Sequence, residues 1–174
     1  MGSHPSCIVP LAEAAGAGDG LVGGKAASLG SLVQAGFRVP RGFCITTLAY
    51  EQFIAEAGLN KHVAMELGRK PLDAMRWEEL WDAALRIRSA FLQAGVPDTI
   101  AAQIRQALAD HVGDGAVAVR SSAPGEDSQQ RSFAGLHESI VGVHGDRAVL
   151  DAVRTVWASL WSDAALLYRR ELSL

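Results

Sequence analysis

The sequence predicts an α/β (α+β) domain in which helices outnumber strands. Its 174 residues are 49% hydrophobic and 20% charged, which is typical of a globular chain and not of a disordered one. Several stretches carry apolar residues at steps of three and four, the period of a helix with one buried face. Three shorter stretches are apolar and β-branched, or alternate, as strands do. Because no repeat or low-complexity linker divides the chain, we expect one domain or a piece of a larger one.

The first third is expected to hold two helices and a strand. Residues 1–20 become rich in glycine and alanine and predict an irregular N-terminal lead-in. Residues 26–35 predict a helix that follows a Gly-Gly turn and stops at a glycine. The apolar run 43–47 predicts a buried strand, and one of its two threonines is expected to cap a helix that continues to about residue 57.

The middle of the chain predicts a long helix after Pro71, with Asp73 as its N-cap. Apolar side chains from Trp77 to Phe91 follow helical steps. Trp77 and Trp81 are therefore expected to pack in the core or against a partner, and not to form a platform for stacked bases.

The last third is expected to alternate strands and helices, with a long polar loop after the first strand. Asp146 is the expected cap of the helix that follows the second strand, and Ser162 or Asp163 that of the last helix. The elements are a helix at 97–112, a strand at 116–120, a loop at 121–135, a strand at 137–143 and helices at 147–161 and 164–174.

Composition also limits the function. The formal net charge of −3 and the pI of about 5.9 argue against a nucleic-acid groove, which needs clustered lysine and arginine. No apolar run approaches the ~18 residues that a membrane span needs, and the first ten residues do not resemble a signal peptide. Cys7 and Cys44 form no Cys-x-x-Cys pair, so we expect reduced packing residues in a cytoplasmic protein. No metal site is predicted, since no His/Cys cluster has zinc spacing.

The first candidate motif is Gly23-Gly24-Lys25, just where a helix is expected to begin. A P-loop would need glycine at the position of Asp19 and Ser or Thr at that of Ala26, so this is not a P-loop. Backbone N–H groups at a helix N-terminus still favour an anion, whereas a lysine there opposes the helix dipole unless an anion lies between them. Two interpretations remain open: a phosphate contact and a solvated lysine beside a turn.

The second candidate is Arg120, which ends a predicted strand and precedes Ser121 and Ser122. An arginine fork suits phosphate oxygens, and ligands often bind where strands end. The alternative is an ion pair with Glu126 or Asp127. The loop that follows is long for a hairpin connection and is either a lid over a ligand or a surface excursion.

Taken together, three blocks of sequence resemble the N-terminal ATP-binding region of the phosphoenolpyruvate synthase and pyruvate phosphate dikinase family. They read "LVGGKAASLGSLVQAGFRVPRGFCITTLAY" from Leu21, "AVRSSAPGEDSQQRSFAGLHESIVGV" from Ala118 and "VWASLWSDAALLYRR" from Val156. The order and spacing fit the family pattern over nearly the whole chain. The resemblance implies an incomplete ATP-grasp-like domain at 21–174, preceded by the lead-in at 1–20.

The resemblance also implies an activity. Such enzymes move a phosphoryl group from ATP to a histidine on a separate swivelling domain, and the phosphohistidine passes it to an acceptor. The acceptor is pyruvate in the synthases and dikinases, and the antibiotic in the related rifampin phosphotransferases. ATP and Mg²⁺ are the implied cofactors. The adenine-binding segment and the magnesium carboxylates are expected downstream of this chain, which alone is expected to be inactive.

Carried over by position, Lys25 would contact the ATP phosphates and Arg120 would be the catalytic cation against the β- and γ-phosphates. Ser121 and Ser122 would shape the turn that places Arg120. The mobile loop over the triphosphate would be Ser132, Phe133, Ala134 and Gly135. Two positions depart from the family pattern. Leu136 stands after this loop, where the family often has glutamine, and Gly125 lies in the run before it, where the family often has Ala-Thr-Ala.

Three functions stay open at this point. The first is the ATP-binding part of a phosphoenolpyruvate-synthase-like phosphotransferase, with the phosphohistidine domain as its partner. The second differs only in a rifamycin-type acceptor. The third is a regulatory or interaction module with a degenerate nucleotide site. A reading frame that stops after Leu174 would favour the module, whereas one that runs on into a glycine-rich histidine motif would favour an enzyme.

Overall fold

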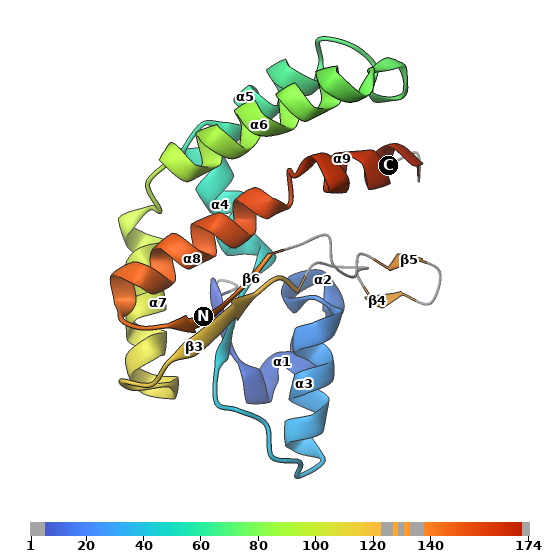
Figure 1. Cartoon of the computed structure of the whole chain (residues 1–174). Helices are drawn as coiled ribbons and strands as arrows, with labels where there is room; N and C mark the ends of the chain where they lie inside the picture. Colours follow the sequence, from blue (N-terminus) through green and yellow to red (C-terminus); the bar gives the residue numbers. More distant parts are fainter. Residues whose placement is uncertain (1–5, 123–126, 129–130, 133–137, 172–174) are drawn as a thin grey trace, which may run out of the picture.

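The computed structural model describes residues 6–122, 127–128, 131–132 and 138–171. A two-stranded ribbon of β3 and β6 crosses the middle of the molecule (Figure 1), with α8 beside it, the N-terminal helices on one side and α5, α6 and α9 on the other. The strands are β1 (Ile8–Pro10), β2 (Phe43–Ile45), β3 (Val117–Arg120), β4 (Asp127–Ser128), β5 (Arg131–Ser132) and β6 (Ser139–Val143). The helices are η1 (Leu11–Glu13), α1 (Ala14–Ala17), α2 (Asp19–Val22), α3 (Gly24–Gln34), α4 (Thr47–Glu56), α5 (Leu59–Leu67), η2 (Leu72–Ala74), α6 (Trp77–Gln93), α7 (Asp98–His111), α8 (Asp146–Ser159) and α9 (Asp163–Glu171).

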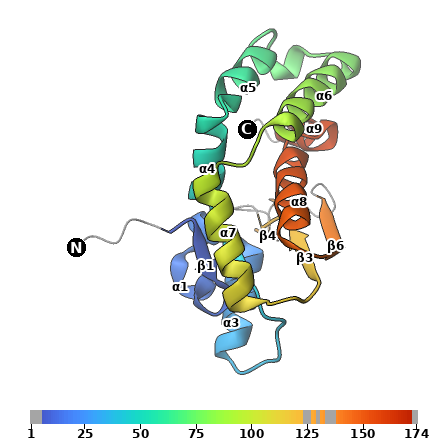
Figure 2. The ribbon, with the colours of Figure 1, turned by 90° about the vertical axis from the view of Figure 1, so that its left-hand side faces the viewer.

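In the described residues, the strands form three antiparallel pairs. Val9 lies opposite Cys44 where β1 pairs with β2, and Arg120 lies opposite Ser139 where β3 pairs with β6. Asp127 and Ser132 are opposite each other in the short β4–β5 pair. Figure 2 shows α7 next to β1, and α8 along the β3–β6 pair. The helix-rich architecture with small sheets confirms the predicted α+β class.

The main core is aromatic and joins helices that are far apart in sequence. The Phe53 ring of α4 stacks on the Trp157 ring of α8, with ring centroids 4.8 Å apart, and meets Phe91 of α6 edge to face at 5.8 Å. Phe53 and Phe91 are fully buried. Offset and edge-on aromatic pairs add to the burial of apolar area, so these rings hold α4, α6 and α8 together.

The arm made of α5 and α6 contains a buried carboxylate. Glu66 of α5 is 1% exposed and accepts hydrogen bonds from Arg69, at 3.0 Å, and from Arg86 of α6, at 2.9 Å. Since an unpaired buried charge is costly, the two arginines are what allows a carboxylate at this position. The arginine from α6 thereby ties α6 to α5.

The N-terminus of α9 is capped as predicted, because the Ser162 hydroxyl accepts a hydrogen bond from the Ala165 N–H at 3.1 Å. The predicted cap of the long helix is wrong. Asp73 lies in the short η2 turn, and Arg76 is the N-cap, where its backbone N–H donates to the Glu79 carboxylate at 2.8 Å. The Asp146 cap is off by one position, since Asp146 is the first residue of α8.

Other expectations differ from the structure. The lead-in is not irregular throughout, because residues 8–17 form β1, η1 and α1, and residues 19–22 form α2. The helix α5 has no counterpart among the elements expected from the sequence. The prediction that Trp77 and Trp81 pack in the core is wrong, because these side chains are 58% and 47% exposed. Within the described ranges, every helix is too short or too polar to span a membrane.

Candidate phosphate-binding site

The Gly-Gly-Lys motif begins α3, as a buried turn between two helices. Gly23 follows α2 and has φ +77° and ψ 160°, a conformation that glycine adopts easily and other residues do not. This turn starts α3 at Gly24 and puts the half-buried Lys25 in its first turn. The motif therefore contains the first N–H groups of α3, and the N-terminal end of a helix favours an anion.

Ser122 lies directly against this turn. Its hydroxyl oxygen accepts a hydrogen bond from the Ala26 N–H at 3.0 Å and so caps α3 from another part of the chain. A Cβ atom on Gly23 would overlap the carbonyl oxygen of Ser122. No side chain fits there, so the two backbone segments pack together only because residue 23 is glycine.

Arg120 lies two residues before this contact, at the end of β3. The strand alternates half-buried and exposed residues, and Arg120 is on the exposed face. Ser121 and Ser122 are half-buried. The structure therefore brings the two candidate motifs together: Lys25 and Arg120 are each within a few residues of the Gly23–Ser122 contact.

The expected loop residues are described only at its stem. Ser132 lies in β5, and the β4–β5 pair lies beside α3. Figure 1 shows this pair on the side of the molecule where α2 and α3 meet. Phe133, Ala134 and Gly135 lie outside the described residues, as does Glu126, the alternative partner of Arg120.

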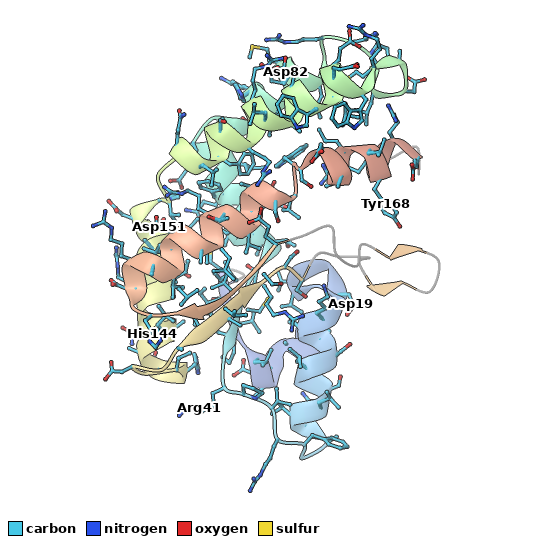
Figure 3. The ribbon with its side chains drawn as sticks, in the orientation of Figure 1. Asp19, Arg41, Asp82, His144, Asp151 and Tyr168 are labelled. Atoms are coloured by element: carbon cyan, nitrogen blue, oxygen red, sulfur yellow. The ribbon has the colours of Figure 1, made fainter. Side chains whose placement is uncertain are left out.

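A shallow, open depression occurs elsewhere, along the first turns of α6. Trp77, Trp81 and the carboxylates of Glu78, Glu79 and Asp82 line it. Figure 3 shows Asp82 of α6 and Asp19 of α2 at widely separated places, so this depression is not part of the Gly-Gly-Lys site. In the described part of the chain, no three His, Cys, Asp or Glu side chains are grouped to hold a metal ion.

The sequence suggests a local role for Ser122 and does not reveal its contact with Gly23. The sequence does contain one indication of this contact. The pair of glycines in the motif suggests that another backbone segment approaches closely there. Nothing in the sequence indicates that Ser122 is the approaching residue, since the two are far apart along the chain.

Comparisons with known proteins show the family to which the chain belongs. Residues 19–174 match the family described as "Pyruvate phosphate dikinase, AMP/ATP-binding domain". The phosphoenolpyruvate synthase of Aeropyrum pernix is 42% identical over 166 residues, which cover 88% of this chain and 19% of that protein. A rifampicin phosphotransferase of a Streptomyces species is 39% identical over 163 residues, which cover 93% of this chain and 19% of that protein. The probable phosphoenolpyruvate synthase of Methanothermobacter thermautotrophicus is 40% identical over 157 residues, 87% of this chain and 23% of that protein. The chain thus spans about a fifth of the length of these relatives.

Proposed function

This chain belongs to the family of pyruvate phosphate dikinase AMP/ATP-binding domains, and from this premise we propose that it forms the N-terminal part of an ATP-grasp-like domain in a larger phosphotransferase. The whole enzyme would move a phosphoryl group from ATP to a histidine on another domain, and from there to pyruvate. The resemblance seen in the sequence is confirmed at the level of the family. The reaction, the acceptor and the histidine domain are our proposal.

The observation that carries this proposal is the contact between Gly23 and Ser122. Because of it, the N-terminus of α3, Lys25 and the end of β3 lie on neighbouring backbone segments. Backbone N–H groups, an ammonium group and a guanidinium group are the donors that polyphosphates need. Phosphoryl transfer depends mainly on positioning and on neutralising phosphate charge, so Lys25 and Arg120 would hold the triphosphate and stabilise its developing charge.

Ser121 and the loop residues complete the proposed site. Ser121 follows Arg120 at the strand end and would add a hydroxyl donor. Ser132, Phe133, Ala134 and Gly135 would cover the triphosphate and exclude water, as lids do. Ser132 belongs to the β4–β5 pair, which lies beside α3 and would anchor such a cover there.

Magnesium would accompany the nucleotide, where it neutralises phosphate charge. The described residues offer no group of carboxylates for it. We therefore propose that its ligands, like the adenine pocket, come from sequence beyond this chain. The 174 residues alone should then bind Mg·ATP only weakly, with a Kd of about 1 mM or more, and micromolar binding in calorimetry would contradict the proposed division of the site.

The acceptor can be tested on the complete protein encoded by the reading frame that contains this chain. If our proposal is right, ATP consumption will depend on pyruvate, and ATP carrying labelled phosphoryl groups will leave acid-labile label on a histidine. Dependence on a rifamycin in place of pyruvate would support the second candidate, which the Streptomyces relative favours. A protein that neither consumes ATP with either acceptor nor acquires label would be the non-catalytic module.

A further inference from the structure

A second feature of the molecule points to an anion: Arg169, near the end of α9. The Cζ atom of its guanidinium group lies 4.6 Å from the centroid of the Trp161 ring. The indole is itself fixed, because Trp161 Nε1 donates a hydrogen bond to the Tyr50 hydroxyl of α4 at 2.9 Å. The guanidinium face is thus stacked on a rigid ring, which leaves its N–H donors at the edge to serve another group.

No carboxylate in the described residues compensates the charge of Arg169. Burial lowers the pKa of Arg169, and the nearby group that raises it is the Tyr50 hydroxyl. Burial also raises the pKa of Tyr50, so this hydroxyl stays protonated and brings no negative charge. By contrast, Arg86 and Arg105 each form an ion pair with a carboxylate.

The surroundings of Arg169 are connected to one half of the candidate site through α4. The Thr47 hydroxyl, one turn before Tyr50, donates to the Gly20 carbonyl at 3.1 Å. Gly20 belongs to α2, which leads directly into Gly23 and Lys25. The helix that holds the Trp161 ring in place is therefore bonded to the segment that carries Lys25.

They are connected to the other half through α8. The Ser159 hydroxyl, two residues before Trp161, accepts a hydrogen bond from the Glu138 N–H at 3.1 Å. The next residue, Ser139, lies opposite Arg120 in the β3–β6 pair. The two helices that flank the Trp161 ring, α4 and α8, are thus each hydrogen-bonded to a segment next to the candidate site.

We propose that Arg169 is a further binding residue of the polyphosphate site, and that it contacts a phosphate oxyanion of the nucleotide through the free edge of its guanidinium group. This inference rests on the proposed function, because the ligand is the same nucleotide. A half-buried cation without a counter-charge is costly, and a bound oxyanion removes that cost. Because the guanidinium group is stacked on the Trp161 ring, the Arg169 side chain has few conformations, and little conformational entropy is lost when it binds an anion.

The test uses inorganic tripolyphosphate as the probe and the 174-residue chain as the protein. The Nε–Hε resonances of the arginine side chains are followed by NMR up to about 10 mM probe, well above the range of a weak millimolar contact. We expect the Arg169 resonance to shift and to saturate. Arg169→Gln should weaken binding by about tenfold or more, the loss of one charge-assisted contact. Arg105→Gln, which removes an exposed cation paired with Asp146, should not change it.

Two further arms separate the possible failures. Arg169→Lys keeps the charge but loses the fork, so it should retain only part of the affinity, while dispersed spectra of both variants show that they fold. Acetate is titrated as a carboxylate probe. A response to acetate with none to tripolyphosphate would overturn the phosphate assignment, and an Arg169 resonance that neither probe moves would overturn the site. If the Arg120 resonance responds while that of Arg169 does not, this inference fails and the proposed function stands. A response of Arg169 alone would instead count against the proposed function.

Discussion

The hydroxyl of Ser122 caps the helix that begins beside Lys25, by accepting a hydrogen bond from the N–H of Ala26 at 3.0 Å, although Ser122 and Ala26 are 96 positions apart. The hydrogen bond joins the two motifs that the sequence offers as separate candidates. It pairs one of the N–H groups at the start of α3 that have no partner within the helix. The geometry of the proposed site therefore depends on a contact between two backbone segments as much as on its charged side chains.

Ser122→Ala should destabilise the folded chain by about 1 kcal/mol, the usual cost of losing a side chain that caps a helix N-terminus. Urea unfolding followed by circular dichroism measures it. Ser31→Ala is the matched control, because the Ser31 hydroxyl donates to the Ala27 carbonyl on the exposed side of the same helix. Equal effects of the two substitutions would mean that the cap at Ala26 contributes nothing specific.

Gly23→Ala should be far more damaging, by more than about 3 kcal/mol, because it combines a strained backbone with a collision. Two controls separate these causes. Gly18 also has positive φ, but no other atom lies within 4 Å of the place that a Cβ would take, so alanine there should cost only about 1–2 kcal/mol. Gly20 has space and lies in α2, so alanine should be neutral or slightly stabilising. If Gly18→Ala and Gly23→Ala are equally destabilised, the collision with Ser122 is unimportant.

Much of the fold follows from local patterns, and the failures have physical causes. The bounds of α3, α7 and β3 follow from periodicity, and that of α3 also from a glycine stop, which are local signals. Segment α5 carries a charged residue that is buried, Glu66, and its partner Arg86 lies in another helix. A pattern of apolar residues cannot reveal a helix whose inward face includes a paired carboxylate.

The candidate site shows the same limit. The chemistry of Lys25 and Arg120 can be anticipated from residue type and from the family resemblance. Their proximity depends on the Gly23–Ser122 contact, which is a tertiary relationship. Helical spacing likewise predicts that Trp81 and Trp157 are equally buried. Of the two, Trp157 is buried in the main core, whereas Trp81 is exposed.

Trp157→Ala should destabilise the chain by about 3–5 kcal/mol, since the ring is 8% exposed and packs on Phe53. Trp81→Ala removes a ring of the same size that is 47% exposed, and should cost less than about 1 kcal/mol. Urea midpoints of the two variants give the comparison. A large loss for Trp81→Ala in the isolated chain would show that its face of α6 is covered in solution.

The two thiols should differ in reactivity. Burial raises the pKa of Cys44 to about 11, so that at pH 8 only about one Cys44 in a thousand is a thiolate. Cys44 is also enclosed, with its Sγ 3.5 Å from the Val22 carbonyl oxygen, whereas Cys7 is half-buried. Iodoacetamide should therefore modify Cys7 first in the native chain, as mass spectrometry can measure. In urea the two should react alike, and fast native labelling of Cys44 in a Cys7→Ser variant would contradict its burial.

Arg120→Ala should reduce ATP-dependent turnover of the complete protein by at least about a hundredfold, because the guanidinium group would no longer offset the charge that develops on the transferring phosphoryl oxygens. Arg120→Lys keeps a positive charge but not the fork of donors, so it should recover part of the rate. Lys25→Ala should also be severely impaired. The matched control is Arg41→Ala, since Arg41 is exposed and donates to the Asp110 carbonyl away from the site (Figure 3). Near-normal turnover of Arg120→Ala would show that Arg120 takes no part in the reaction. The contact between the end of β3 and the Gly-Gly-Lys turn would then no longer support a phosphate site.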